Sequence, residues 1–169
     1  MKWFGLIVFI VLFQSARAQQ NGAAGEPPYK KNPHIPELNL LQVDSTILSS
    51  SDLKKNQNTI IMYFSPSCDH CIHQMDEMMG QLDALKHFQI IMATYQPFEE
   101  MELFYKKYKL ADLHNFKLGR DTKFQLPPFY IIRSLPYFAL YDKKGNLVTT
   151  FDGNVKVEAL VKAFSKKNS

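Results

Sequence analysis

The sequence predicts an α/β fold, with a central β-sheet flanked by helices on both faces. Three observations lead to this class. Short runs rich in β-branched and aromatic residues alternate with longer amphipathic segments along the chain. One run, residues 59–65, is almost continuously apolar, as expected for a strand buried on both faces. The amphipathic segments between such runs have the pattern of helices that cover a sheet.

The strands are assigned where β-favouring residues gather. A short strand over residues 38–44 comes first, followed by a helical turn and loop over 52–58. Further strands are expected over residues 59–65, 89–95, 129–134, 137–142 and 147–151. Residues 143–146, Lys-Lys-Gly-Asn, predict a hairpin turn between the last two. Residues 110–128, which include Pro127-Pro128, are expected to form a loop.

Three segments have apolar side chains at helical spacing. The first spans residues 69–87, and Gly80 marks a point where this helix is expected to kink. The second starts after Pro97, a residue favoured at helix starts, and runs to about Lys109. The last follows Asn154, which is predicted to be its N-cap, and ends in lysines that complement the helix dipole.

The N-terminus predicts a secretory signal. Lys2 precedes an apolar run over residues 3–13, and the small-x-small pattern that ends at Ala18 is typical of a cleavage site. The apolar run is shorter than the roughly 20 residues of a membrane-spanning helix, so an N-terminal anchor is the less favoured alternative. We therefore expect a signal peptide over 1–18, a flexible linker over 19–37, one domain over 38–169, and a periplasmic location.

Composition limits the classes of partner. The formal net charge is +4, and the lysines are scattered in pairs along the chain. Nucleic-acid-binding domains concentrate such charge on one face. The chain length fits a single domain with a sizeable core. We therefore expect a monomer that binds no nucleic acid.

The two cysteines of the chain, Cys68 and Cys71, lie three positions apart. A disulfide that closes so short a loop stabilises a fold by about 2 kcal/mol, against about 4–5 kcal/mol for a loop of a hundred residues. The pair therefore indicates redox chemistry. At the start of a helix, the unpaired backbone N–H groups favour a thiolate. We assign Cys68 as the attacking nucleophile and Cys71, one turn later, as the resolving thiol.

The intervening residues tune this pair. His70 is expected to stabilise the Cys68 thiolate, which makes the disulfide more oxidising, whereas Asp69 opposes it by repulsion between like charges. Metal alternatives are weaker. A structural zinc site needs two further ligands in a second pair, and a Cu(I) site would combine both thiolates with His70 or His73. A peroxide-reducing enzyme would need a peroxidatic cysteine in a Thr- and Pro-containing pattern, which the sequence lacks.

Two segments carry a family resemblance. Phe64-Ser65-Pro66-Ser67-Cys68-Asp69-His70-Cys71 resembles the active-site segment of thioredoxin-like proteins, in particular exported thiol–disulfide oxidoreductases of the TlpA and ResA type and redoxin-domain proteins of Bacteroidetes. Residues 130–136 and the following Asp142-Lys143-Lys144-Gly145 are similar to the later part of the same family. The resemblance implies a thioredoxin-like fold with a mixed sheet, no cofactor, and protein thiol or disulfide partners, including a membrane or soluble redox partner. It also implies a cis Leu135-Pro136 peptide that shapes the substrate groove.

The sequence departs from this family at two acidic positions. Met62 stands where thioredoxins carry a buried acid, and Gln74 stands where the exported branch often has a glutamate. Either acid would accept the proton of the resolving thiol. Water, His70, Asp76 or Glu77 are the remaining acceptors, and the direction of exchange stays open. The expected function is periplasmic disulfide exchange with protein partners; the alternative is a thioredoxin-fold module that binds Cu(I) or a protein without turnover.

Overall fold

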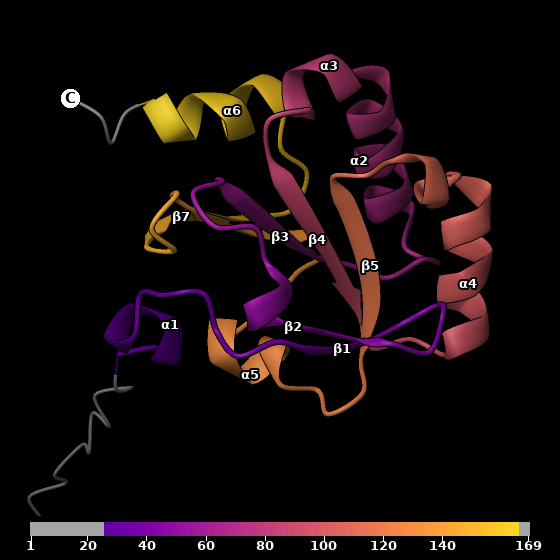
Figure 1. The fold of residues 1–169 in the computed structure, drawn as a ribbon, viewed down its shortest axis with the longest axis horizontal. Helices are drawn as coiled ribbons and strands as arrows, with labels where there is room; N and C mark the ends of the chain where they lie inside the picture. Colours follow the sequence, from indigo (N-terminus) through magenta and orange to yellow (C-terminus); the bar gives the residue numbers. More distant parts are fainter. Residues whose placement is uncertain (1–25, 166–169) are drawn as a thin grey trace, which may run out of the picture.

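The computed structural model describes residues 26–165, so the predicted signal peptide and the first part of the predicted linker lie outside the described residues. A seven-stranded sheet with the order β2-β1-β5-β4-β3-β6-β7 crosses the molecule (Figure 1). The strands are β1 (Asn39–Gln42), β2 (Ile47–Ser49), β3 (Thr59–Tyr63), β4 (Gln89–Thr94), β5 (Phe116–Asp121), β6 (Tyr137–Tyr141) and β7 (Leu147–Asp152). Strand β4 runs parallel to β3 and β5, and the other pairs are antiparallel, which confirms the mixed sheet.

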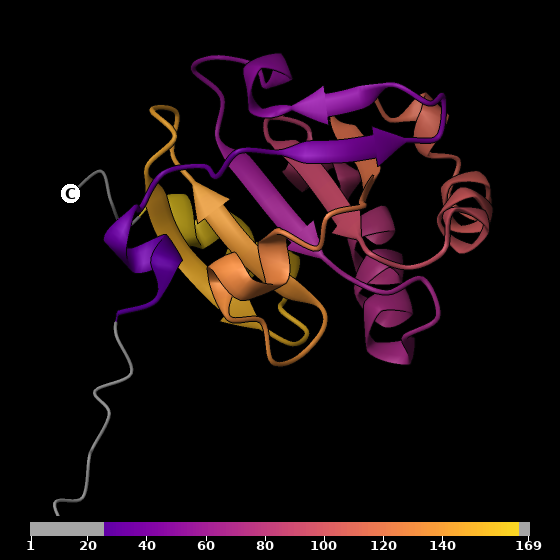
Figure 2. The same ribbon diagram turned by 90° about the horizontal axis from the view of Figure 1, so that it is seen from below.

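Helices cover both faces of this sheet, as predicted (Figures 1 and 2). The helices are α1 (Pro28–Lys31), α2 (Asp69–Gly80), α3 (Leu82–Leu85), α4 (Phe98–Lys107), α5 (Leu126–Tyr130) and α6 (Val157–Ser165). Helices α2, α3, α4 and α6 contribute to one buried cluster, and α1 and α5 contribute to the other. Two short 3₁₀ turns, Ser50–Asp52 and Leu110–Asp112, complete the regular structure.

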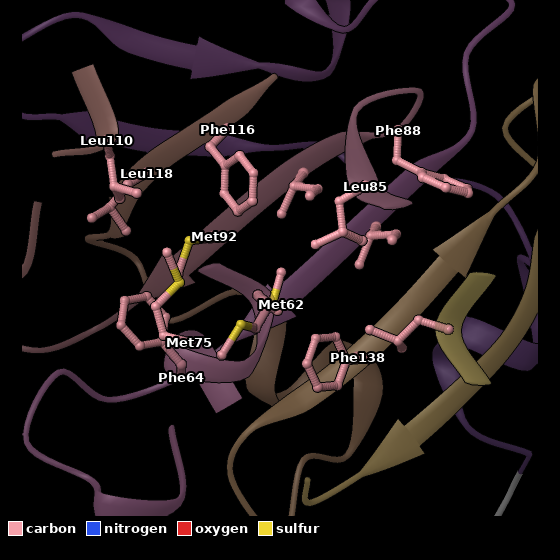
Figure 3. Close-up of a cluster of buried hydrophobic side chains, with 14 of the residues drawn as sticks. Met62, Phe64, Met75, Leu85, Phe88, Met92, Leu110, Phe116, Leu118 and Phe138 are labelled. Atoms are coloured by element: carbon pink, nitrogen blue, oxygen red, sulfur yellow. The ribbon is translucent and has the colours of Figure 1, made fainter. Parts of the chain in front are cut away.

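The two clusters arise because successive residues of a strand point to opposite faces. Met62 of β3 pairs with Phe138 of β6, and both belong to the cluster under α2, which we call the apolar face (Figure 3). The neighbouring pair, Tyr63 and Tyr137, belongs to the cluster under α5, which we call the tyrosine face. The redox segment Cys68–Cys71 lies on the apolar face.

Most predicted elements are present. Strands β1, β3, β4 and β6 lie within the strands expected from the sequence, and β7 extends one residue beyond its expected end. The Lys143–Asn146 turn joins β6 and β7. The expected kink is a break: α2 ends at Gly80 and α3 begins at Leu82. Helix α4 begins directly after Pro97. Strand β2, which pairs with β1 at the edge of the sheet, was not predicted.

The prediction of a loop over residues 110–128 is wrong. This segment contains β5, which lies between β1 and β4. Its polar residues Lys117, Arg120 and Asp121 conceal the strand pattern, although Phe116 and Leu118 are buried. Gly119 allows β1 to approach closely, because a Cβ atom there would lie 2.7 Å from Leu40 Cβ.

The predicted strand over residues 129–134 is also wrong, because α5 occupies its first part. The Asp121 carboxylate accepts hydrogen bonds from the Gln125 and Leu126 N–H groups and so holds the start of α5. Pro127 lies in the first turn, where its missing N–H costs no helical hydrogen bond. The helix ends at Tyr130, and the C-cap residue Ile131 has a φ of 56°, in the left-handed region.

The linker before β1 and the start of α6 both differ from the sequence-based expectation. Part of the expected linker contacts the domain: Tyr29 of α1 packs 6.0 Å from Tyr130, between ring centroids, and the Ile35 N–H donates to the Gly145 carbonyl. Asn154 does not cap α6, which starts at Val157. Its side chain instead donates to the His70 carbonyl at 2.7 Å.

Candidate active site

Cys68 occupies the N-cap position of α2, at the junction between a strand and a helix that the sequence predicts. The loop from β3 brings it there, and the Cys68 N–H donates to the Ser65 carbonyl at 3.2 Å. Cys68 is partly exposed, whereas Cys71 is fully buried, and both are free thiols. Only Cys68 is therefore accessible to the disulfide of another protein.

The buried thiol is held in its protonated form. Burial raises the pKa of Cys71 to about 12, with a smaller opposing effect from a hydrogen bond to the Ser65 backbone. The neighbouring Cys68 sulfur raises the pKa further, because it hydrogen bonds to Cys71 and carries charge of the same sign. The two cysteines thus differ in environment: Cys68 is exposed to solvent, whereas Cys71, one helical turn later, is buried and protonated.

The Leu135–Pro136 peptide bond is cis, as the resemblance implies. Pro136 directly precedes β6, whose first residue Tyr137 pairs with Tyr63 at the end of β3. The loop that carries Cys68 leaves the sheet at this same end of β3. The register therefore brings the proline and the cysteine segment to one edge of the sheet, and Leu135 packs against the apolar cluster that Cys68 also contacts.

Gln74, which stands in the place of the family's glutamate, has a structural contact. It is fully buried on α2. Its Nε2 donates to the Val155 carbonyl at 2.9 Å, and its Oε1 accepts from the Val155 N–H at 2.7 Å. Together with the bond from Asn154 to His70, this amide fastens the loop before α6 to the redox helix. Met62 is fully buried among apolar side chains.

The carboxylates named as alternative proton acceptors also bind other elements. Asp76 accepts a hydrogen bond from the Tyr108 hydroxyl at 2.9 Å. Glu77 accepts from the Val157 N–H at 3.1 Å and lies 3.8 Å from the Lys156 ammonium. The pKa of Tyr108 is raised by burial and by the adjacent Asp76. Both carboxylates thus position helices.

Asp69 and His70 lie exposed in the first turn of α2. Neither side chain makes a hydrogen bond within the described residues. Both remain next to the cysteines in sequence. In the described part of the chain, no three His, Cys, Asp or Glu side chains are grouped so as to hold a metal ion. No helix within residues 26–165 is both long enough and apolar enough to cross a membrane.

A cleft of about 440 Å³ opens beside the cis peptide, and sequence reasoning did not predict it. It is lined by Tyr63, Tyr95, Phe124, Pro127, Ile132, Arg133, Ser134 and Leu135. These residues come from the ends of β3 and β4, from α5 and from the segments on either side of α5, so no local pattern unites them. The one sequence signal was Tyr95, an aromatic residue directly after a buried strand.

Comparison with solved structures identifies the fold. A protein from Neisseria meningitidis described as a thioredoxin matches with a TM-score of 0.64 and 23% identity, over 79% of this chain and 90% of that one. StoA from Bacillus subtilis matches with a TM-score of 0.61 and 22% identity, over 78% and 99%. A thiol-disulfide oxidoreductase from Bacteroides fragilis matches with a TM-score of 0.60 and 18% identity, over 79% and 98%. The chain has a thioredoxin-like fold. No family model and no curated protein sequence matches it.

Proposed function

We propose that this protein is a periplasmic thiol–disulfide oxidoreductase that exchanges disulfides with protein partners. One observation carries the proposal: an accessible Cys68 caps α2, one turn from a buried Cys71, at the edge of the sheet that also holds a cis proline. The Bacteroides fragilis protein of the same fold is itself a thiol-disulfide oxidoreductase, which supports the assignment. The narrower resemblance to the TlpA and ResA type, the periplasmic location and the monomeric state are part of the same proposal.

In the reductive direction, the Cys68 thiolate attacks one sulfur of a partner disulfide. A Cys68–partner disulfide forms, the partner's S–S bond breaks, and the partner's second sulfur leaves as a thiolate. Cys71 then attacks the Cys68 sulfur, which forms the intramolecular disulfide and frees the partner's first sulfur. The partner gains two electrons and two protons, and the Cys68–Cys71 pair loses them. Oxidation of a partner dithiol is the reverse sequence.

The proton of Cys71 must leave before the second attack. Gln74 has no titratable group, and Asp76 and Glu77 bind other elements. In our proposal, the proton passes to the partner thiolate released in the first step, which is basic and close to the reacting sulfurs. Resolution then depends on a bound partner, since a thiol with a raised pKa ionises slowly by itself.

Substitution of each cysteine tests the proposal. Cys68→Ala should abolish reduction of the insulin disulfides, because the accessible nucleophile is lost. Cys71→Ala should accumulate a mixed disulfide between Cys68 and insulin, visible as a reducible adduct in mass spectrometry. Full insulin reduction by Cys68→Ala would overturn the proposal. Ile47→Ala, an exposed position on β2 outside the site, is the matched control.

Equilibration with glutathione buffers measures the direction of exchange. A potential near the value of about −270 mV for thioredoxin indicates a reductant, and one near about −120 mV indicates a disulfide donor. His70→Ala should lower the potential and Asp69→Ala should raise it, because the two side chains act on the Cys68 thiolate with opposite charge. Equal potentials in both variants and the unsubstituted protein would remove the tuning role of these residues.

A further inference from the structure

The cleft beside Leu135 has a mouth that is unusually aromatic and exposed. Tyr95 and Phe124 are 43% and 50% exposed, although each is large and apolar. Both line the cleft of about 440 Å³ to which Leu135 also contributes. Leu135 packs against the apolar cluster that Cys68 contacts and against the tyrosine cluster that contains Tyr63, so it links the cleft to the redox segment. Exposed apolar surface grouped at a hollow is typical of an interaction site.

The aromatic rings form an ordered platform. The Tyr63 and Tyr95 rings are stacked, with centroids 6.5 Å apart and planes 12° apart. Tyr95 meets Phe124 edge to face, with centroids 5.4 Å apart and planes 90° apart. Tyr63 is buried and fixes the inner end of this series. The two outer rings are thus held in place before any partner arrives, which lowers the entropy lost on binding.

Phe124 reaches this position through an unfavourable backbone conformation. Its φ is 51°, in the left-handed region that bulky side chains avoid. The turn is held by the hydrogen bond from the Phe124 N–H to the Asp121 carbonyl at 3.1 Å. Half of the ring remains exposed, so core packing does not compensate for the strain. Strained residues of this kind cluster at functional sites.

One charged residue lines the same cleft. Arg133 is exposed and forms no ion pair or hydrogen bond within residues 26–165, and no Asp or Glu is among the lining residues. A guanidinium presents donors that match a carboxylate. The cleft therefore combines an aromatic platform with a cation that has no protein partner of its own.

We infer that this cleft selects partner segments in which the reactive cysteine is flanked by an aromatic residue and an acidic residue. The aromatic side chain packs on Tyr95 and Phe124, and the carboxylate pairs with Arg133, while the partner sulfur lies on the Cys68 side of Leu135. This inference rests on the proposed function and adds a class of substrate to it. Tyr95, Phe124 and Arg133 are specificity residues and take no part in the chemical steps.

Peptide substrates test the inference with the full chain. Three peptides share one intramolecular disulfide: the first has Phe and Glu beside a cysteine, the second has Ala for Phe, and the third has Lys for Glu. We expect the first to be reduced about tenfold faster, as kcat/KM, than either other peptide, because hot-spot contacts of this kind carry much of the binding energy. Equal rates for the three peptides would overturn the inference.

Variants assign the preference to the cleft. Arg133→Glu should reverse the preference between the Glu and Lys peptides, and Tyr95→Ala should remove the preference for Phe over Ala. Phe124→Gly should also remove it, while the free energy of unfolding rises or stays constant, because glycine accepts the left-handed conformation. The control Ile47→Ala should keep both preferences. Retained preferences in Arg133→Glu and Tyr95→Ala would place the selection elsewhere and overturn the inference.

A small disulfide distinguishes failure of the proposed function from failure of the specificity inference. Hydroxyethyl disulfide is too small to fill the cleft and carries no charge. If the reduced protein does not reduce it or insulin, and the oxidised protein does not oxidise a small dithiol, the proposed function fails. If the protein reduces it but treats the three peptides alike, only the specificity inference fails.

Discussion

The two faces of the sheet solve the same packing problem with different side chains. The apolar face is filled mostly by methionine, leucine and phenylalanine, among them Met62, Met75 and Met92 (Figure 3). Cys71 belongs to the same cluster. The tyrosine face buries Tyr63, Tyr130, Tyr137 and Tyr141. Burial in this largely apolar environment keeps the resolving thiol protonated. Each buried hydroxyl group on the other face needs a hydrogen-bond partner, because burial without one costs free energy.

The tyrosine face finds such partners only in part. The Tyr130 and Tyr141 hydroxyls lie 2.6 Å apart and form a buried hydrogen bond. The Tyr63 and Tyr137 hydroxyls are buried and form no hydrogen bond of standard geometry within the described residues. The Asp121 and Thr150 side chains nevertheless lie near enough to influence the pKa values of Tyr63 and Tyr137, respectively. An unpaired buried hydroxyl costs free energy, and Tyr63 is also the inner ring of the cleft platform. The face with unsatisfied buried hydroxyls is thus also the face that carries the cleft.

Alkaline pH should produce the largest difference between the faces. Burial raises the pKa of all four tyrosines, that of Tyr137 to about 12. Above about pH 10 the unfolded chain releases phenol protons that the folded chain retains. The stability that these tyrosines contribute is therefore fully present below about pH 10 and falls as pH rises, by up to about 1.4 kcal/mol per pH unit for each such group. The buried Cys71 thiol, whose pKa burial raises to about 12, adds a smaller fall that begins near pH 9. Urea midpoints between pH 8 and 11 measure the fall.

A double variant sharpens this test. Tyr63→Phe combined with Tyr137→Phe removes two of the four phenols, so the decline above pH 10 should become shallower. A urea midpoint that stays constant from pH 8 to 11 would contradict the burial of these hydroxyls.

Truncation on the apolar face should have the next largest effect. Phe138→Ala leaves a cavity at the centre of this face, and we expect a loss of about 3–5 kcal/mol in the free energy of unfolding. Urea unfolding at neutral pH measures it. Ile47→Ala should change stability by less than about 0.5 kcal/mol. Similar values for both variants would mean that Phe138 is not central to the core.

Breaking the tyrosine pair should cost less. Tyr141→Phe leaves the Tyr130 hydroxyl buried without a partner, which should cost about 1–3 kcal/mol. The double variant Tyr130→Phe/Tyr141→Phe removes both hydroxyls and should recover most of this loss in the same urea experiment. A double variant that is less stable than Tyr141→Phe would show that the pair is not isolated from other polar groups.

The smallest effect is expected at Tyr137. Its hydroxyl forms no hydrogen bond of standard geometry in the described structure, so Tyr137→Phe should leave the free energy of unfolding within about 0.5 kcal/mol or increase it. Equilibrium unfolding at pH 7, in parallel with Tyr141→Phe, makes the comparison. A loss as large as that of Tyr141→Phe would reveal a hydrogen bond that the structure lacks.

The sequence predicts the elements that have strong local patterns. Strand β3 is continuously apolar, and Cys68 follows it directly, so the strand–cysteine–helix junction could be predicted from local residues alone. Strand β5 could not be predicted in this way. Its pairing with β1 and β4 makes it a strand, whereas its own polar sequence has no strand pattern. Helix α5 was concealed by Phe129, Tyr130 and Ile131, which favour strands in isolation.

The site divides in the same way. The cysteine pair and the cis Leu135–Pro136 bond follow from motifs, the second through the family resemblance. The roles of Gln74 and of the cleft do not, because they depend on contacts between segments far apart in the chain. Gln74 binds Val155, and Tyr95 meets Phe124. Such contacts form through tertiary packing, which a single sequence does not display.

The clamp between Gln74 and Val155 also has a consequence in time. A chain is synthesised from its N-terminus, so the residues of α2 are made long before residues 154–157, which supply their hydrogen-bond partners. Until then the Gln74 amide has neither of its backbone partners. The hydrogen bonds that fasten the redox helix α2 are therefore complete only when nearly the whole chain is available for folding.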